Sequence, residues 1–512
     1  MVRTPKNPER HLIGITVCVM LATIMQALDT TIANVALPYM QGSLSATLDQ
    51  INWVLTSYIV AAAIMTPPTG WLAARFGRKR LFIFTVAGFT VASALCGMAS
   101  SLEEMVAFRL LQGVFGAPLV PLSQSVLLDS YPKERHGSAM ALWGVGVMVG
   151  PILGPTLGGY LTEMYNWRWV FYINLPIGIL TIVGLTVYLD ETKLEKVMRF
   201  DWLGFATLSL AIGGFQMMLD RGQQLDWFSS AEIAIEAALA GLAVYMFIVH
   251  TLTTDNPFID PKMFADRNFT TGVIFVFFVG IILLATLALM TPYLQSLMGY
   301  PVLTAGLVLA PRGVGTMIAM IAVGRVINRV DSRWLILLGL SLTALSLWEM
   351  TGFTPDVSQN TLIWTGVVQG LGLGFIFVPL STVTFSTLSP AYRTQGASLF
   401  ALTRNIGSSI GISIVIFLLG RNTQIVHSEL AVHANALNDL FRAPNVAAIW
   451  SLGSEAGRLA LNAEVTRQAT IIAYANDFKL MMWVALGAMP LVLLLRRNRA
   501  APSPGPAAAA LD

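Results

Sequence analysis

Stretches of about 20 mostly apolar residues follow one another along this chain, from Leu12 almost to Leu495. A helix of about that length crosses the apolar core of a bilayer. Hydrophobic residues make up 55% of the sequence and charged residues only 12%, and this balance excludes the soluble globular classes. The sequence therefore predicts an all-α polytopic membrane protein.

We expect about fourteen membrane-spanning helices. Their expected ranges are 12–37, 49–73, 81–99, 103–128, 137–161, 168–189, 201–219, 230–252, 270–291, 303–326, 334–352, 361–387, 396–419 and 475–495. The first shows no small-residue cleavage site, so we expect it to be retained as a helix and not removed as a signal peptide. Cys18 and Cys96 both lie within apolar stretches, which indicates neither a disulfide framework nor a metal site.

Lysine and arginine residues gather in every second connection between the expected spans, as is typical of cytoplasmic loops. The basic residues are Arg3, Lys6, Arg10, Arg75, Arg78, Lys79, Arg80, Lys133, Arg135, Lys193, Lys196, Arg199, Lys262, Arg267, Arg329, Arg333, Arg393, Arg496, Arg497 and Arg499. We therefore expect both chain ends in the cytoplasm and an even number of spans. The net charge of +3 reflects these loops and requires no nucleic-acid partner.

The second part of the chain repeats short patterns of the first part at an offset of about 254 residues. The matched pairs are Pro38-Tyr39 with Pro292-Tyr293, Gly70 with Gly324, and Gln112-Gly113 with Gln369-Gly370. Spans one to six therefore correspond to spans nine to fourteen, and spans seven and eight are inserted between them. Two six-helix halves with a binding site near the midplane between them are a known transporter arrangement.

The expected domains follow from this repeat. They are a cytoplasmic N-terminus (1–11), a six-helix bundle (12–190), two inserted helices (200–255), a second six-helix bundle (268–496) that includes an extracytoplasmic loop (420–474), and a disordered cytoplasmic tail (497–512). In the loop, apolar residues recur at helical spacing, as from Val446 to Trp450, so we expect helical segments that lie over the outer mouth. The sequence leaves open whether this loop docks a partner or only covers the cavity.

The fifth expected span is dense in glycine and proline. Proline inside a helix removes a backbone donor and clashes with the preceding turn, while glycine lets a neighbouring helix approach closely. The residues are Gly150, Pro151, Gly154, Pro155, Gly158 and Gly159. We expect this helix to be bent and closely packed, although the stretch alone also fits a packing helix of any transporter.

Charged side chains inside a membrane span are costly and mark functional positions. Asp29 in the first span and Arg109 in the fourth reach a similar depth, so the two side chains can form an ion pair between helices. Such an aspartate can exchange a proton as a cavity opens and closes, and can thereby couple proton entry to substrate release. The alternative is a permanent structural ion pair.

Arg312, in the tenth span, is the deepest cation of the chain and can either meet an anionic substrate group or neutralise a helix carbonyl end and a nearby carboxylate. For Arg404, in the thirteenth span, pairing with a structural partner is favoured over contact with a substrate. Aromatic and methionine side chains form permissive, apolar binding pockets. The candidate substrate-binding residues are Met25, Gln26, Trp53, Tyr58, Gln112, Trp143, Arg312 and Phe375.

Several motifs of the chain are similar to those of the major facilitator superfamily. The basic loop after the second span resembles GxLaDrxGrK, with matches at Gly70, Leu72, Ala73, Arg75, Gly77, Arg78 and Lys79. Ala74 replaces the usual aspartate of that motif, and Asp129 is the alternative acidic partner for the loop. The RxxQG motif is matched by Arg109, Gln112 and Gly113.

Two further motifs narrow the resemblance. Leu28 to Pro38 matches the LDxTIxNVALP signature of fourteen-span drug/proton antiporters, and Trp167 to Pro176 follows their sixth helix. The glycines and prolines of the fifth span resemble the antiporter motif GxxxGPxxGG. From about Leu12 to Leu495, the chain thus resembles the EmrB-type branch of these multidrug exporters.

This resemblance implies an inner-membrane, proton-driven exporter of amphipathic toxic compounds that rocks two six-helix halves about a midplane cavity. It implies proton or cationic-drug handling by Asp29, proton coupling by Arg109, exchange through the fifth-span glycines and prolines, and gating by the basic loop. It also implies a periplasmic adaptor of the EmrA type and an outer-membrane channel as partners. No cofactor is expected, because the proton gradient supplies the driving force.

Three alternatives stay open. The first is a dedicated exporter of a natural carboxylate, such as a siderophore or a fatty acid, for which Arg109 and Arg312 are suited. The second is a membrane-embedded lipid enzyme, which is disfavoured because the histidines are scattered over termini and loops: His11, His136, His250, His427 and His433. The third is a proton-coupled importer, which is disfavoured because the second-half counterpart of the glycine motif, around Gly407 and Gly411, lacks both prolines. We expect a transporter and not an enzyme.

Overall fold

The computed structural model describes residues 8–191, 199–434 and 450–496, and the regular structure within these ranges is helical. The first half consists of α1 (Pro8–Ser43), α2 (Leu48–Ile51), α3 (Trp53–Met65), α4 (Thr69–Phe76), α5 (Arg78–Met98), α6 (Leu102–Gly116), α7 (Leu119–Ser130), α8 (His136–Met164), α9 (Trp169–Tyr172) and α10 (Asn174–Tyr188). The inserted helices are α11 (Trp202–Arg221) and α12 (Ala231–Thr253). The second half consists of α13 (Arg267–Pro292), α14 (Val302–Val326), α15 (Ser332–Met350), α16 (Gln359–Ser386), α17 (Arg393–His433) and α19 (Glu455–Ala488).

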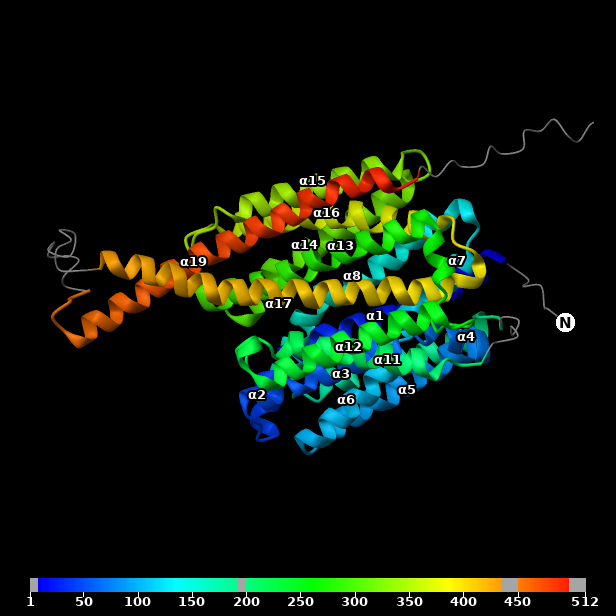
Figure 1. Ribbon diagram of the computed structural model, residues 1–512, viewed down its shortest axis with the longest axis horizontal. Helices are drawn as coiled ribbons and strands as arrows, with labels where there is room; N and C mark the ends of the chain where they lie inside the picture. The colour runs from blue at the N-terminus through cyan, green and yellow to red at the C-terminus, as the bar shows by residue number, and fades with distance from the viewer. Residues whose placement is uncertain (1–7, 192–198, 435–449, 497–512) are drawn as a thin grey trace, which may run out of the picture.

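Among the described residues, thirteen helices are long and apolar enough to cross a membrane. The expected span 49–73 is instead divided into α2, α3 and α4, which follow one another along the long axis of the molecule (Figure 1). The main break falls at Pro67 and Pro68, because two consecutive prolines remove two backbone donors. Pro118 separates α6 from α7 for the same reason, although the two continue as one span.

The helices run roughly parallel to the long axis, and α1 starts at the same end of the molecule at which α19 finishes (Figure 1). We call this end the terminal end and the opposite one the far end. An even number of crossings is consistent with this placement. The arrangement of two six-helix halves plus two inserted helices agrees with the fold expected from the repeat.

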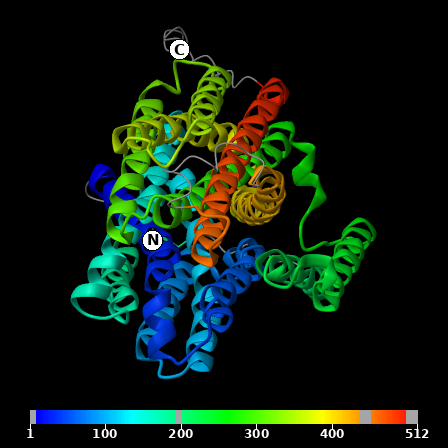
Figure 2. The same ribbon diagram turned by 90° about the vertical axis from the view of Figure 1, so that its left-hand side faces the viewer.

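The inserted pair α11 and α12 lies at the margin of the two bundles (Figure 2). Helix α11 packs against α12, against α3 of the first half and against α17 of the second half. Only 17% of the residues in the most apolar 18-residue stretch of α12 are buried, so most of its side chains are left to face lipid. The pair therefore bridges the two halves on one side.

The last connection differs from the expectation. Helices α17 and α19 continue past the far ends of the other helices (Figure 1), so the described parts of the connection are helical, as expected, but project outward instead of lying over the outer mouth. The reason is local, because no glycine or proline interrupts the chain between Gly420 and His433. His427 and Asn462 form a hydrogen bond of 3.0 Å between the two projecting parts. Val446 to Ile449 and the expected tail 497–512 lie outside the described residues.

Helix α8 joins the two halves, since it packs against α1 on one side and α14 on the other. Toward α14, a methyl group on Gly324 would lie 2.8 Å from the Cβ of Ala141, and Ser138 Oγ donates to the Gly324 oxygen at 2.9 Å. Trp143 of α8 stacks on Phe377 of α16, with 5.8 Å between ring centroids. The expected close packing of the fifth span is thus confirmed.

Toward α1, the glycines of α8 meet backbone and short side chains. A methyl group on Gly150 would collide with the backbone carbonyl of Ala27, and one on Gly154 would collide with Thr31. A methyl group on Gly158 would lie 2.9 Å from Ile32 Cγ1, whereas Gly159 has no such neighbour within 4 Å. Thr31 Oγ1 also donates to the Gly150 oxygen at 3.0 Å. Three of the four glycines therefore set the α1–α8 distance.

The Gly150→Ala substitution is expected to destabilise the protein by about 1–3 kcal/mol, because the added methyl group forces α8 away from the backbone of α1. The measurement is the melting temperature of the purified protein in detergent. Gly159→Ala is the matched control and is expected to melt at or slightly above the wild-type temperature, since alanine favours a helix over glycine. Equal melting of the Gly150→Ala variant and the wild type would contradict this packing.

Candidate functional site

The first half encloses a group of four side chains that we call the buried charge cluster: Asp29, Arg109, Gln112 and Asn174. Helix α1 supplies Asp29, and α6 supplies Arg109 and Gln112 one turn apart, so both point toward α1. Arg109 Nη1 donates to Asp29 Oδ2 at 2.8 Å, and Gln112 Nε2 donates to Asp29 Oδ1 at 2.8 Å. Arg109 Nη1 also lies 2.7 Å from Gln112 Oε1. The expected ion pair between spans one and four is therefore present.

A further donor reaches the same carboxylate from the sixth span. Asn174 Nδ2 donates to Asp29 Oδ1 at 3.0 Å and lies 3.0 Å from Ser93 Oγ, which itself donates to the Phe171 oxygen. Arg109 Nε donates to the backbone oxygen of Val54 at 3.1 Å. Both carboxylate oxygens thus accept hydrogen bonds, from three different side chains on two helices.

The buried charge cluster is sealed. Asp29, Arg109, Gln112 and Asn174 each have 0% exposed surface. The Arg109 guanidinium lies 4.3 Å from the ring centre of Tyr58, which covers it with an aromatic face. Taking two charges out of water costs several kcal/mol per ion unless geometry and hydrogen bonds compensate. The complete set of partners makes this burial possible.

Sequence reasoning identified Asp29, Arg109 and Gln112, but it treated Asn174 only as part of a helix-six motif. Its role in holding Asp29 was missed, as was that of Ser93. A polar side chain in an apolar span was the available signal for both residues. Asp477 of α19 was also missed: it is 1% exposed, and within the described part of the chain neither of its carboxylate oxygens has a hydrogen-bond partner.

The candidate substrate-binding residues do not form one group. Met25 and Tyr58 are buried next to the charge cluster, and Gln26 Nε2 donates to Tyr58 Oη at 3.4 Å. Trp143 is buried between α8 and α16, and Phe375 is half-buried in the same hydrophobic core. Gln112 belongs to the charge cluster itself, while Arg312 lies in the second half.

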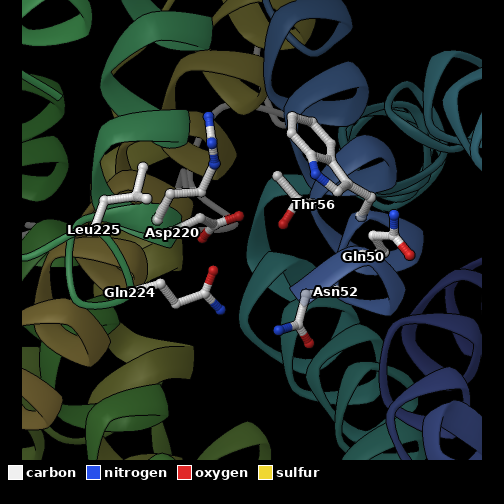
Figure 3. A pocket seen from close by; sticks show the side chains of 8 residues that line it. Gln50, Asn52, Thr56, Asp220, Gln224 and Leu225 are labelled. Carbon is white, nitrogen blue, oxygen red and sulfur yellow. The ribbon is translucent and has the colours of Figure 1, made fainter. Parts of the chain in front are cut away.

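Trp53 lies apart from these residues, in a polar pocket between the α2–α3 segment and the end of α11 (Figure 3). The pocket is lined by Gln50, Asn52, Trp53, Thr56, Asp220, Arg221, Gln224 and Leu225. Arg221 lies over the Trp53 ring at 5.4 Å and pairs with Glu232 and Glu236 of α12. These contacts tie the inserted pair to the first half.

In the described chain, Arg312 and Arg404, the candidate arginines within the spans of the second half, are not surrounded by polar side chains as Arg109 is. Arg312 is 8% exposed and donates from Nη2 to the backbone oxygen of Leu283 at 3.0 Å; within the described residues it pairs with no carboxylate. This oxygen lies within α13 and not at a helix end, so the expected helix carbonyl end is not its partner, and the role of Arg312 toward a substrate anion stays a prediction. Arg404 is half-buried, and its Nη2 lies 3.5 Å from Asn405 Oδ1. No carboxylate pairs with Arg404 in the described ranges either.

A second ionic group, which we call the latch, joins the halves at the terminal end: Arg78, Asp129 and Arg393. Asp129 accepts from Arg78 of the first half, and its Oδ1 accepts from Arg393 Nη1 of the second half at 2.5 Å. Asp129 was the expected substitute for the aspartate that Ala74 replaces, and this pairing is confirmed. Both halves hold the same carboxylate.

The rest of the basic loop supports the latch. A methyl group on Gly70 would lie 2.9 Å from the Cα of Gln395, so this loop contacts the start of α17 directly. Gly77 has φ +86°, a conformation that favours glycine. Two residues later, the backbone N–H of Lys79 donates to Glu191 Oε1 at 3.2 Å. Lys79 Nζ also donates to the Thr186 oxygen at 2.8 Å. Arg75 is exposed.

No group of three or more His, Cys, Asp or Glu side chains suited to a metal ion occurs in residues 8–191, 199–434 and 450–496. The ionisable groups described above are therefore the chemistry that these parts of the chain offer. They are a sealed pair, an inter-half latch, the contacts of Arg221 with α12, the buried Asp477, and Arg312 and Arg404 without carboxylates.

Comparison with known proteins gives a consistent result. The Major Facilitator Superfamily matches residues 19–412. The chain is 38% identical over 493 residues to the multidrug export protein EmrB of Escherichia coli K12, covering 94% of each chain. It is 39% identical over 420 residues to the fatty acid resistance protein FarB of Neisseria gonorrhoeae, covering 82% of this chain and 83% of FarB. Among solved structures, it resembles the human organic anion transporter MFSD10 with a TM-score of 0.56 at 14% identity, covering 94% of this chain and 100% of that one.

Arg109→Gln is expected to destabilise the protein by about 3–5 kcal/mol, because it leaves Asp29 as a buried charge without its cation. The double variant Asp29→Asn/Arg109→Gln removes both charges and is expected to recover much of this loss. Melting temperatures in detergent check the order wild type, double variant, single variant. A double variant that melts below Arg109→Gln would contradict the coupling.

Asp129→Asn is expected to let the halves separate at the terminal end, since it removes the carboxylate that both arginines share. Spin labels on the exposed positions Arg135 and Arg329 report the distance between the halves at that end. We expect a larger population of long distances in the variant. Asp190→Asn, at an exposed aspartate near the same end, is the control, and an Asp129→Asn distribution equal to that control speaks against the latch.

Proposed function

This chain belongs to the Major Facilitator Superfamily, and from that premise we propose that it is a proton-coupled antiporter that exports amphipathic toxic compounds. The observation that carries the proposal is the sealed Asp29–Arg109 pair within a six-helix half. The similarity to a relative named multidrug export protein, over 94% of the chain, supports it. The family is one of transporters, not of enzymes.

Proton coupling follows from how Asp29 is held. Its two oxygens accept hydrogen bonds from Arg109, Gln112 and Asn174. A proton on the carboxyl group removes the negative charge that Arg109 pairs with, so the contact between Asp29 and Arg109 is weakened. Because the donors come from α6 and α10, protonation of Asp29 and movement of these helices relative to α1 are linked.

Alternating access then requires the two halves, residues 12–190 and 268–496, to rock about the α8–α14 contact. The latch closes the terminal end in the described conformation. The basic connections indicate that this end faces the cytoplasm. Opening toward the cytoplasm would therefore require Asp129 to release at least one of its two arginines.

We place the substrate in the space between the halves when they separate. Its walls are proposed to include Met25, Gln26, Tyr58, Trp143 and Phe375, which lie beside the buried charge cluster or at the contact between the halves. Flexible and aromatic side chains accept many apolar shapes. The pocket around Trp53 is a separate, polar feature of the far end.

We further infer that the protein lies in the inner membrane and passes its cargo to a periplasmic adaptor and an outer-membrane channel. The support is the pair of projecting helix ends of α17 and α19, which extend beyond the far end and offer polar side chains. Glu464, for example, binds Arg467 and Gln468 on the exposed surface there. No cofactor is required by the proposed mechanism.

Export of a carboxylate is the second candidate. The observation that favours it is Arg312, which is a buried cation without a carboxylate among the described residues. One relative, FarB, bears the name fatty acid resistance protein.

Proteoliposomes that contain only this protein test the main proposal. A pH gradient is expected to drive movement of lipophilic cations or neutral amphipathic compounds, and Asp29→Asn is expected to abolish gradient-driven movement because the group that exchanges the proton is lost. Asp190→Asn, at an exposed aspartate outside the charge cluster, is expected to retain it. Movement that is indifferent to both the gradient and Asp29 would show that the antiport mechanism is wrong.

A further inference from the structure

The two halves pack a corresponding pair of helices in the same way. In the first half, a methyl group on Gly113 of α6 would lie 2.5 Å from the Tyr58 oxygen and 3.2 Å from the Ala62 nitrogen of α3. In the second half, a methyl group on Gly370 of α16 would meet the oxygen of Arg312 and lie 3.0 Å from the nitrogen of Thr316, both in α14. The residue that corresponds to Tyr58 is therefore Arg312.

The same correspondence between the halves identifies the second-half counterparts of Gln112, Arg109 and Asp29. Gln369 precedes Gly370 as Gln112 precedes Gly113, and Gly366 stands where Arg109 stands in α6. In α13, Leu283 precedes Pro292-Tyr293 at the same distance at which Asp29 precedes Pro38-Tyr39 in α1. The second half thus keeps the amide and has a cation, but the carboxylate is replaced by leucine.

The buried cation of the second half, Arg312, comes from α14, whereas the helix that corresponds to α6 has Gly366 in place of Arg109. Gly366 leaves the space that Arg109 occupies in the first half, and a methyl group on Gly366 would lie 3.6 Å from Arg312 Cβ. The Arg312 guanidinium reaches α13 at Leu283, the position that corresponds to Asp29, and in the part of the chain that the structure describes its partner there is the backbone oxygen. A carboxylate at this place would accept the remaining N–H groups of the guanidinium.

Two observations indicate that the polar side chains at this place lack the partners that their counterparts in the first half have. Gln369 is fully buried, and within the described residues neither its amide oxygen nor its amide nitrogen has a hydrogen-bond partner. A buried amide without partners costs about 1–3 kcal/mol, so it is expected to serve a purpose. Arg312 keeps 8% of its surface exposed, whereas Arg109 keeps none.

We propose that Arg312 and Gln369 bind the carboxylate group of an exported amphipathic compound beside Leu283, so that this group makes the contacts that the Asp29 carboxylate makes in the first half. The proposal rests on the proposed export function and names a substrate class for it. A guanidinium binds a carboxylate through two parallel N–H groups, and an amide N–H adds a third contact. Half-buried apolar side chains on α13 and α14, such as Leu283 and Leu309, suit the apolar part of the compound.

Binding tests the site independently of transport. The purified protein in nanodiscs is titrated with dodecanoate and with the neutral dodecanol by calorimetry. Arg312→Gln is expected to weaken dodecanoate binding about tenfold or more and to leave dodecanol binding unchanged, with partial retention in Arg312→Lys. The matched control is Arg329→Gln, which removes an exposed arginine just beyond the end of α14.

A second variant reaches the same result without removing the arginine. Leu283→Asp places a carboxylate beside Arg312, as Asp29 lies beside Arg109, so the internal carboxylate competes with the ligand. We expect dodecanoate binding to weaken about tenfold or more and the melting temperature to stay near that of the wild type. Unchanged dodecanoate affinity in both Arg312→Gln and Leu283→Asp overturns the proposal, as does equal weakening of dodecanol.

Transport separates this proposal from the function on which it rests. In proteoliposomes with a pH gradient, Arg312→Gln is expected to lose movement of dodecanoate and to keep movement of the lipophilic cation tetraphenylphosphonium. Loss of both compounds to the same extent contradicts a carboxylate site. If the wild type moves neither compound, the export function is wrong, and the binding experiment still decides whether the carboxylate site exists.

Discussion

A charge inside a membrane span has to be compensated within the protein, and this constraint organises the first half of the molecule. Asp29 is compensated completely, because Arg109, Gln112 and Asn174 converge on it from two helices. This convergence fixes the relative positions of the first, fourth and sixth spans. The glycines of α8, which bring that helix against α1 on another side, complete a half that is rigid around its charge.

The second half has corresponding helices, but its buried charge is not compensated by a charge of opposite sign among the described residues. Gln369 has no hydrogen-bond partner in the described chain, and Arg312 finds a backbone oxygen in place of a carboxylate. The two halves of an internal repeat have thus diverged in opposite directions. One half holds its own anion, for which we propose proton exchange, and the other holds a cation, for which we propose binding of an anion from outside. Such a division of roles allows an exchange of proton for substrate without overlapping sites.

Much of this architecture could be predicted from the sequence, because the relevant signals are local. Apolar stretches define the spans, and the depth of Asp29 and Arg109 in their spans predicts their pairing. The loss of an aspartate at Ala74 points to Asp129 as a substitute. The sequence could not predict which side chains from different helices meet, because that depends on packing. The hydrogen bond from Asn174 to Asp29 is one example, and the lack of a hydrogen-bond partner for Asp477 in the described chain is another. The length of α17 beyond its span was missed because polar residues there suggested a loop.

Helix α17 has a mechanical consequence. It begins at Arg393, which is held by Asp129, and continues for 41 residues without interruption to His433 at the projecting tip. At 1.5 Å per residue this is a stiff rod of about 60 Å, roughly twice the thickness of the bilayer core. It is therefore a lever whose short movements at one membrane face are amplified at the other. A tilt of about 10° displaces the tip by roughly 10 Å, so a protein bound at the tip would be moved whenever the helix tilts about its base.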